Sequence, residues 1–271
     1  MKTSTVKDKM KRGENILCVA SHYTTPAIVE LIGKFGFDCL WICNEHVGIN
    51  RETLENLIRA ARINDMDAMV RIVRGQYDDL IQPLEMGAKG IMIPHVLTPE
   101  DAARIVADTK FPPQGHRGID GVNPDADMGF METKTYMRFA NENTFIVPQI
   151  EDMEALDRVE EIAAVKGIDI LFVGPADLSN SMGLSGDIKH QRVQDAIKRV
   201  ARACEKNGIY CGTPGIDVEY TQRLLDMGVK FIAAGGDYGI LRAGFTKLRD
   251  IFEPLGFPLR TMNGSPSTYA D

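Results

Sequence analysis

The chain of 271 residues has no long apolar run, no paired-cysteine pattern and no excess of basic charge. A membrane-spanning helix needs roughly 20 consecutive apolar residues, and no segment approaches that length. The five cysteines are odd in number, scattered and without CxxC spacing, which disfavours a disulfide framework and a zinc cluster. The net charge of -7 disfavours nucleic acid, because binding to phosphates requires clustered Lys and Arg. These absences disfavour membranes and nucleic acids as partners and leave small molecules.

The N-terminal segment MKTSTVKDKMKRGEN is charged and lacks the apolar stretch of a signal peptide. Cysteines embedded in apolar runs are typical of reduced thiols. We therefore expect a cytoplasmic location.

Short apolar runs alternate with longer helical patterns, and a glycine precedes most of the runs, as in MGAKGIMI, VKGIDILF and MGVKFIA. This repeated layout is typical of a parallel sheet built from strand and helix units. Eight such units predict a (β/α)8 TIM barrel. The expected domain covers residues 1-257, and the polar segment 258-271 is expected to be disordered or to pack on a neighbouring subunit. The expected strands are Ile16–Ala20, Cys39–Cys43, Ala68–Ile72, Gly90–Pro94, Phe145–Ile150, Ile168–Val173, Ile209–Gly212 and Phe231–Ala234.

A long segment at about 109-143, rich in Pro, Gly and Asp, interrupts the repeat. Long loops in compact domains are often functional. We expect this one to leave the top of the fourth strand, beside the mouth of the barrel. Arg117 within it either reaches a ligand or holds the loop together.

Two carboxylates follow apolar strands: Glu151 closes FIVPQIE and Asp177 follows ILFVGPAD. One strand, helix and strand unit separates them, so in a parallel sheet both emerge at the same edge. Oxygen ligands suit a hard divalent cation such as magnesium or manganese, and Gln149 lies nearby in sequence. The sequence therefore predicts a metal site at this edge.

Further polar residues lie at strand ends. Arg71 begins inside an apolar strand, so it either binds the carboxylate or enolate oxygen of a small acid or pairs with Glu45 or Glu151. His46 is the preferred candidate for the base, ahead of His22 and His95. The turn at Gly174 either offers backbone N–H groups to a carboxylate or uses Asp177 as a plain helix cap.

The segments FGFDCLWICNEH, VRIV, MGAKGIMIPHVLTPEDA, PPQGHRG, VPQIEDMEAL and GIDILFVGPADLSNSMG resemble the HpcH/HpaI family of class II pyruvate aldolases, which includes 2,4-dihydroxyhept-2-ene-1,7-dioate aldolases. The resemblance covers the chain from about Gly13 to Phe257. It implies a barrel of the phosphoenolpyruvate/pyruvate-binding type, assembled as a hexamer, with a divalent metal (Mg2+ or Mn2+, or Co2+).

The resemblance also assigns roles. It implies Glu151 and Asp177 as metal ligands, Arg71 as the clamp on the enolate and carbonyl, and Gln149 as a pyruvate contact. The base is implied to be His46, acting through metal-bound water. The backbone at Gly174, Pro175 and Ala176 would hold the pyruvate carboxylate, and Glu85 stands where the family places the Asp that pairs with the base.

The implied reaction is reversible retro-aldol cleavage of a 4-hydroxy-2-oxo acid to pyruvate and an aldehyde through a metal-bound enolate. The chain departs from the family pattern at Cys43, Asn44, Glu85 and His95, which leaves the identity of the aldehyde open. Two alternatives stay open. One is another enolate-forming enzyme, such as a decarboxylase, a lyase or a citrate-forming condensing enzyme. The other is a non-catalytic barrel that binds an oxoacid.

Overall fold

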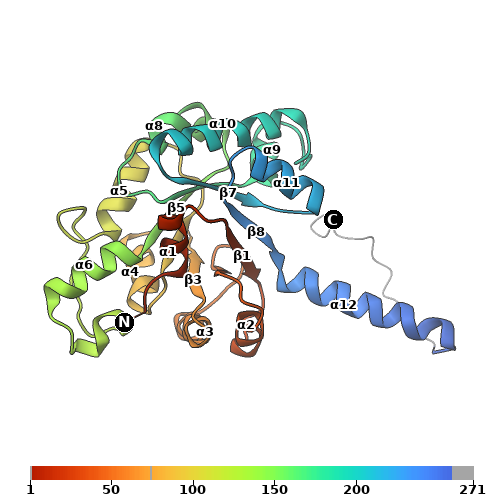
Figure 1. Ribbon diagram of the computed structural model, residues 1–271, viewed down its shortest axis with the longest axis horizontal. Helices are drawn as coiled ribbons and strands as arrows, with labels where there is room; N and C mark the ends of the chain where they lie inside the picture. The colour runs from red at the N-terminus through yellow and green to blue at the C-terminus, as the bar shows by residue number, and fades with distance from the viewer. Residues whose placement is uncertain (1, 74, 258–271) are drawn as a thin grey trace.

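The computed structural model describes residues 2–73 and 75–257; the expected C-terminal tail, 258–271, lies outside the described residues. The strands form a closed parallel barrel in sequential order, which confirms the expected (β/α)8 fold (Figure 1). No strand boundary differs from expectation by more than two residues. The strands are β1 (Ile16–Ser21), β2 (Cys39–Cys43), β3 (Asp67–Arg71), β4 (Gly90–Ile93), β5 (Phe145–Ile150), β6 (Ile170–Val173), β7 (Tyr210–Pro214) and β8 (Phe231–Gly236).

The helices begin at the expected start signals. Thr98 and Asp217 accept a hydrogen bond from a backbone N–H in the first turn of their helices, and Pro26 opens another at its first position. The helices are α1 (Thr5–Arg12), α2 (Pro26–Gly33), α3 (Arg51–Ile63), α4 (Tyr77–Glu85), α5 (Pro99–Thr109), α6 (Thr133–Asn143), α7 (Met153–Asp157), α8 (Val159–Ala163), α9 (Pro175–Ser181), α10 (Gln191–Asn207), α11 (Val218–Asp226) and α12 (Asp237–Phe252), with short 3-10 turns at Pro124–Gly129 and Glu253–Leu255.

Large side chains fill the interior of the barrel. Phe145, Phe172 and Phe231 are fully buried there. Glycines make room for the rings: a Cβ atom at Gly90 would lie 2.2 Å from the ring of Phe145, and one at Gly212 would lie 2.9 Å from Phe172. The barrel is therefore a packed core, and any reactant must bind at its open end.

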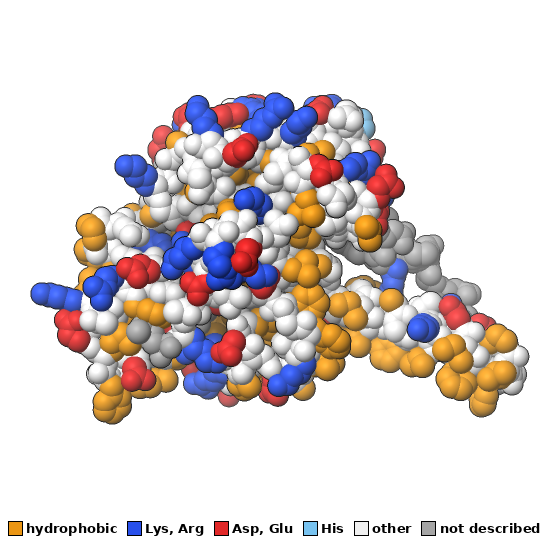
Figure 2. Space-filling view, viewed as in Figure 1, with side chains coloured by type: hydrophobic (Ala, Val, Ile, Leu, Met, Phe, Trp, Pro, Cys, Tyr) orange, Lys and Arg blue, Asp and Glu red, His pale blue; other side chains and the backbone are white. Residues whose placement is uncertain are grey.

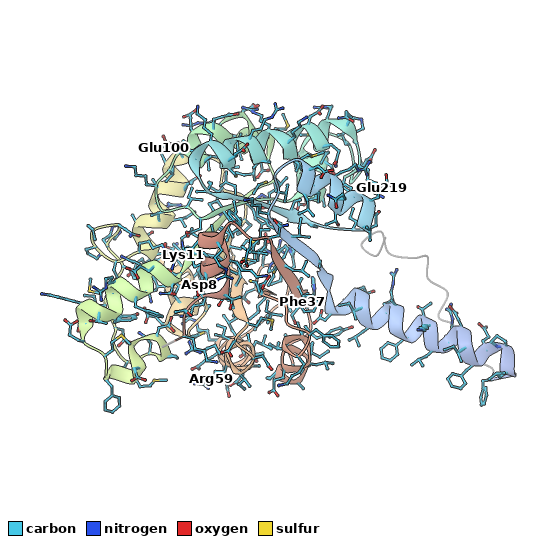
Figure 3. The ribbon with its side chains drawn as sticks, in the orientation of Figure 1. Asp8, Lys11, Phe37, Arg59, Glu100 and Glu219 are labelled. Atoms are coloured by element: carbon cyan, nitrogen blue, oxygen red, sulfur yellow. The ribbon has the colours of Figure 1, made fainter. Side chains whose placement is uncertain are left out.

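Helix α1 closes the opposite end, where the strands begin. Its Lys7 pairs with Asp169 and its Lys9 with Asp38, at 2.8 Å in the second case. The N-cap Ser4 and the backbone N–H of Val6 both donate to Asp67. Elsewhere on α1, Asp8 and Lys11 form an ion pair at 3.5 Å (Figure 3). These contacts leave the carboxyl ends of the strands as the face available for chemistry.

Contrary to expectation, the long segment does not leave the top of the fourth strand. It follows α5 and leads into β5, so it lies where the strands begin. The reason is directional: the helix after a strand runs back along the barrel, and whatever follows that helix starts at the far end. Arg117 is 3% exposed, donates to Glu85 and lies 4.7 Å over the ring of Phe111, so it holds the segment together.

Helix α12 projects away from the barrel (Figure 1). Its one buried residue is Asp237, at its start. Hydrophobic side chains gather along the helix in Figure 2. The apolar residues exposed on α12 and just beyond it are Tyr238, Ile240, Phe245, Leu248, Ile251, Phe252, Leu255 and Phe257.

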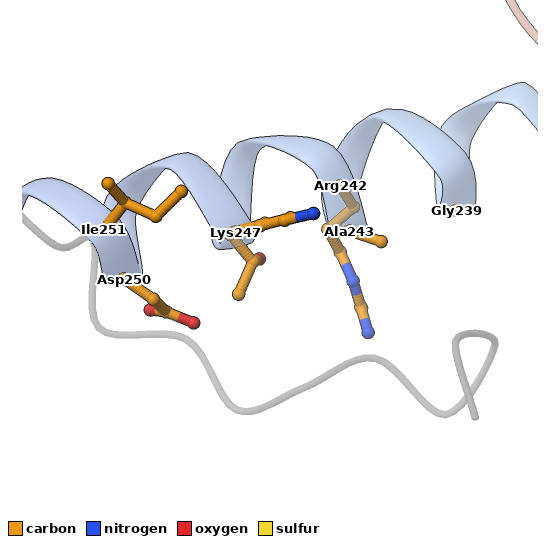
Figure 4. Close-up of a pocket in the computed structure, with 7 residues that line it drawn as sticks. Gly239, Arg242, Ala243, Lys247, Asp250 and Ile251 are labelled. Carbon is orange, nitrogen blue, oxygen red and sulfur yellow. The ribbon is translucent and has the colours of Figure 1, made fainter.

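A hollow of about 510 Å³ runs along α12, and the described residues that line it, including Arg242, Lys247 and Asp250, belong to this helix (Figure 4). It lies outside the barrel and shares no residue with the barrel mouth. Among the residues that the structure describes, no helix is both long and apolar enough to cross a membrane.

Candidate active site

The predicted site residues come together, with one exception, at the carboxyl ends of the strands. Arg71 is the last residue of β3, Glu151 follows β5, and Asp177 lies in the first turn of α9, directly after β6. Because β3 to β6 are consecutive neighbours in the barrel, these side chains share one side of the mouth.

Glu151 is the most deeply buried carboxylate of the group, at 2% exposed. Its Oε1 accepts a hydrogen bond from the backbone N–H of His95 at 2.8 Å, and its Oε2 accepts one from Nε2 of Gln149 at 2.9 Å. Burial raises the pKa of Glu151 to about 7; the negative charges of Asp177 and Glu45 contribute to this rise, whereas the hydrogen bond from His95 and the charge of its ring oppose it. A buried carboxylate facing other carboxylates is stabilised in its charged form by a cation.

Gln149 has an unmatched group. It is 2% exposed, and its Oε1 has no hydrogen-bond partner among the described residues, although Nε2 is bound to Glu151. A buried polar atom without a partner costs free energy unless a ligand or water binds it. This amide therefore fits a site that receives a polar ligand.

Asp177 is exposed, in contrast to Glu151. In the described residues no cluster of three or more His, Cys, Asp or Glu side chains is arranged to hold a metal. Two carboxylates match the way magnesium binds, with few protein ligands and the remaining positions taken by water or substrate. The donor set fits a hard divalent cation and not a closed structural site.

Arg71 is 8% exposed and adopts the paired arrangement that was one of its two alternatives. Its Nε lies 3.0 Å from Oε2 of Glu45, and its Nη2 donates to Sγ of Cys43 at 3.0 Å. The guanidinium carbon lies 4.8 Å from the centre of the Trp41 ring. These contacts hold the guanidinium at the mouth, and its role toward a substrate is a proposal.

Glu45 links Arg71 to His46. The Oε2 atom that faces Arg71 lies 3.7 Å from Nε2 of His46, whose side chain is 64% exposed. The backbone N–H of His46 donates to Sγ of Cys43 at 3.4 Å. An exposed imidazole oriented by a carboxylate can exchange a proton with a ligand at the mouth.

Glu85 is the exception. Within one chain it does not meet His46: it ends α4, at the end of the barrel where the strands begin, and accepts hydrogen bonds from Arg117 and Asn123. The family resemblance pointed to Glu85 as a carboxylate near His46, but it did not show where in the barrel Glu85 lies. Glu45, whose place next to His46 in the sequence favoured His46 as the candidate base, is the carboxylate that lies beside the His46 ring.

The turn at Gly174 offers fewer donors than expected. The N–H of Gly174 is bound to the carbonyl of Ile150 at 3.2 Å, and Pro175 has no N–H. The backbone donors left in the first turn of α9 are those of Ala176 and Asp177. Gly174 contributes space instead, since a Cβ atom there would lie 2.5 Å from Oε2 of Glu151.

Sequence reasoning ranked His95 low and did not consider Asp152. Nδ1 of His95 lies 2.9 Å from Oδ2 of Asp152 and 3.6 Å from Oε1 of Glu151. The hydrogen bond with Asp152 raises the pKa of His95. The sequence signal that could have identified His95 and Asp152 is their position just after the β4 and β5 strands.

Comparisons with known proteins point to one family of enzymes. The model of the HpcH/HpaI aldolase/citrate lyase family matches residues 19–243. A 5-keto-4-deoxy-D-glucarate aldolase of Salmonella arizonae is 35% identical over 86% of this chain and 90% of its own. A hydroxypyruvate/pyruvate aldolase of Delftia acidovorans is 34% identical over 87% of each chain. The crystal structure of an HpcH/HpaI aldolase from Desulfitobacterium hafniense superposes with a TM-score of 0.88, at 27% identity, over 94% of this chain and 99% of that one.

Proposed function

Because the chain belongs to the HpcH/HpaI aldolase/citrate lyase family, we propose that it is an aldolase that reversibly cleaves a 4-hydroxy-2-oxo acid to pyruvate and an aldehyde. The observation that carries the proposal is the meeting of Glu151, Asp177, Gln149 and Arg71 at one side of the barrel mouth. The names of the relatives support the same reaction class.

Glu151 and Asp177 are proposed to hold a divalent cation, Mg2+ or Mn2+, or Co2+. A bound cation would polarise the 2-oxo carbonyl of the substrate. The support is the pair of oxygen donors, together with the buried position of Glu151, whose carboxylate faces the negative charges of Asp177 and Glu45. His95 and Gln149 fix the orientation of the Glu151 carboxylate through the hydrogen bonds that they donate.

The 2-oxo acid is proposed to lie between Arg71 and the first turn of α9. Arg71 presents a guanidinium to the oxygen on which negative charge develops, and its contacts with Glu45 and Cys43 keep it in place. The N–H groups of Ala176 and Asp177 are the backbone donors available for the carboxylate. Gln149 adds an amide to the same side.

In the cleavage direction, the 4-hydroxyl group loses its proton, the C3–C4 bond breaks, and its electron pair forms the enolate of pyruvate. His46 is the proposed acceptor of that proton, with Glu45 orienting its ring. The aldehyde leaves, and protonation of the enolate at C3 completes pyruvate. Condensation is the reverse sequence.

Exchange of the methyl protons of pyruvate with deuterium from D2O tests the proposal, because it isolates enolate formation from the unknown aldehyde. We expect exchange, followed by NMR, that depends on added Mg2+, Mn2+ or Co2+ and is lost in Asp177→Ala. A purified protein that binds none of these cations and exchanges no protons would contradict it and favour a non-catalytic barrel.

The protein is further proposed to be a homo-oligomer in which α12 packs against another copy. In a (β/α)8 barrel the last helix covers the outer face of the last and first strands. Here α12 projects away, and Leu17 on β1 is 41% exposed, while Phe35, directly after α2, is 74% exposed. An exposed apolar helix and an uncovered apolar strand face on the same chain fit each other across two copies. The number six comes from the family resemblance.

A cytoplasmic location is also proposed. It is supported by the five cysteines, which are all buried and free.

A further inference from the structure

His95 has a backbone conformation that is uncommon for a residue other than glycine. Its φ is 51°, in the left-handed region, where a side chain with a Cβ atom is disfavoured. Such a conformation costs free energy and persists where surrounding contacts enforce it. Here the enforcing contact is the hydrogen bond from the N–H of His95 to Glu151.

The side chain of Asp152 does not form the helix-capping hydrogen bond that is usual at its position. It is the N-cap residue of α7, yet its side chain accepts none of the backbone N–H groups of that helix. Its carboxylate instead faces Nδ1 of His95 at 2.9 Å. An Asp in this position ordinarily caps its helix and stabilises it.

The left-handed backbone of His95 and the contact of Asp152 with its ring together orient the His95 imidazole at the mouth. The ring is 44% exposed, and with Nδ1 bound to Asp152 the atom left for a ligand is Nε2, for which the described residues provide no partner. The ring follows β4, next to the strand that carries Gln149 and Glu151. It therefore borders the site of the 2-oxo acid without belonging to the proposed cation ligands.

We propose that His95, oriented by Asp152, is a specificity-determining residue that binds a hydroxyl substituent of the aldehyde through Nε2. The inference rests on the proposed aldolase function. A hydroxyl group both donates and accepts, so it can bond to Nε2 whether or not that atom carries a proton. The substrates selected are hydroxylated aldehydes, in preference to unsubstituted aldehydes of the same length.

The test compares glycolaldehyde with acetaldehyde as acceptors in condensation with pyruvate. The variant His95→Gly removes the ring, tolerates the left-handed backbone and keeps the N–H that binds Glu151. We expect kcat/KM for glycolaldehyde to fall about tenfold, as for the loss of one hydrogen bond to a ligand. The value for acetaldehyde should fall much less, so the ratio of the two kcat/KM values is the quantity that reports the specificity role.

Asp152→Ala is the second variant, because it leaves His95 in place and removes only the group that orients it. It should lower the preference for glycolaldehyde, chiefly through KM. His116→Ala is the matched control: His116 also pairs with an aspartate, Asp108, at 2.9 Å, but on the long segment away from the mouth.

Equal losses of kcat/KM for both acceptors in His95→Gly would overturn the specificity role. So would a wild-type enzyme that shows no preference for glycolaldehyde. Failure of the wild type to exchange pyruvate protons would instead count against the proposed function itself, so the two failures are distinguishable.

Discussion

Gly174 and Glu151 are packed so closely that a Cβ atom at position 174 would lie 2.5 Å from Oε2 and 3.1 Å from Cβ of Glu151. The φ of Gly174 is -87°, which any residue adopts, so the glycine is required for space and not for its backbone freedom.

Gly174→Ala should therefore displace the Glu151 carboxylate. We expect the affinity for Mn2+ and the rate of pyruvate exchange to fall roughly 10- to 100-fold, as when a group supporting a metal ligand is changed. Titration calorimetry and NMR measure the two quantities. Gly121→Ala is the control, because a Cβ atom there meets nothing within 4 Å. Equal behaviour of the two variants would refute the close-packing argument.

Asp177→Ala should abolish cation binding and activity while leaving the fold intact. Asp177 is exposed, so removing its carboxylate opens no cavity in the core. Circular dichroism and the thermal midpoint should match those of the wild type, whereas Mn2+ titration should show no binding. An unchanged rate would eliminate Asp177 as a ligand.

The stability of the cation-free protein should fall as pH rises from about 4 to 7. Burial raises the pKa of Asp67 from 3.8 to about 6 and that of Glu151 from 4.5 to about 7. Between its two values, each carboxyl binds more protons in the folded state than in the unfolded state, so a rise in pH favours unfolding. The slope is at most about 1.4 kcal/mol per pH unit for each carboxyl.

Urea unfolding between pH 4 and 8, with a chelator present, measures this dependence. Glu151→Gln should flatten the curve between about pH 4.5 and 7, and Asp67→Asn should flatten it between about pH 3.8 and 6. Stability that rises with pH across this range would show that burial does not dominate these two carboxyls.

Phe245→Glu combined with Leu248→Glu should break the assembly proposed for α12. Both side chains are at least half exposed in one copy, at 66% and 52%, so a single barrel does not need them. In the proposed assembly, where α12 packs against another copy, each introduced glutamate would lie in an apolar contact without a positively charged partner. Light scattering coupled to gel filtration should show a smaller species, and the thermal midpoint should fall. Thr246→Glu on the same helix is the control. An unchanged molecular mass of the double variant would refute the proposed packing of α12 against another copy.

The amino-acid sequence by itself determined the eight-stranded barrel and the face that carries its chemistry. Apolar runs such as FIVPQI and ILFV report local burial, and local burial is what sequence periodicity records. The polar residues after those runs, Glu151 and Asp177 among them, follow from the geometry of any parallel barrel.

Only the tertiary structure decided which groups meet. It placed Glu85 with Arg117 at the far end of the barrel and Glu45 beside His46, because the direction of each helix determines which end its last residue reaches. It turned His95 into the left-handed region through a hydrogen bond to Glu151, a contact between residues 56 positions apart that no local pattern encodes. It also left α12 away from its own barrel, since an amphipathic pattern is the same whether the apolar face packs on one copy or another.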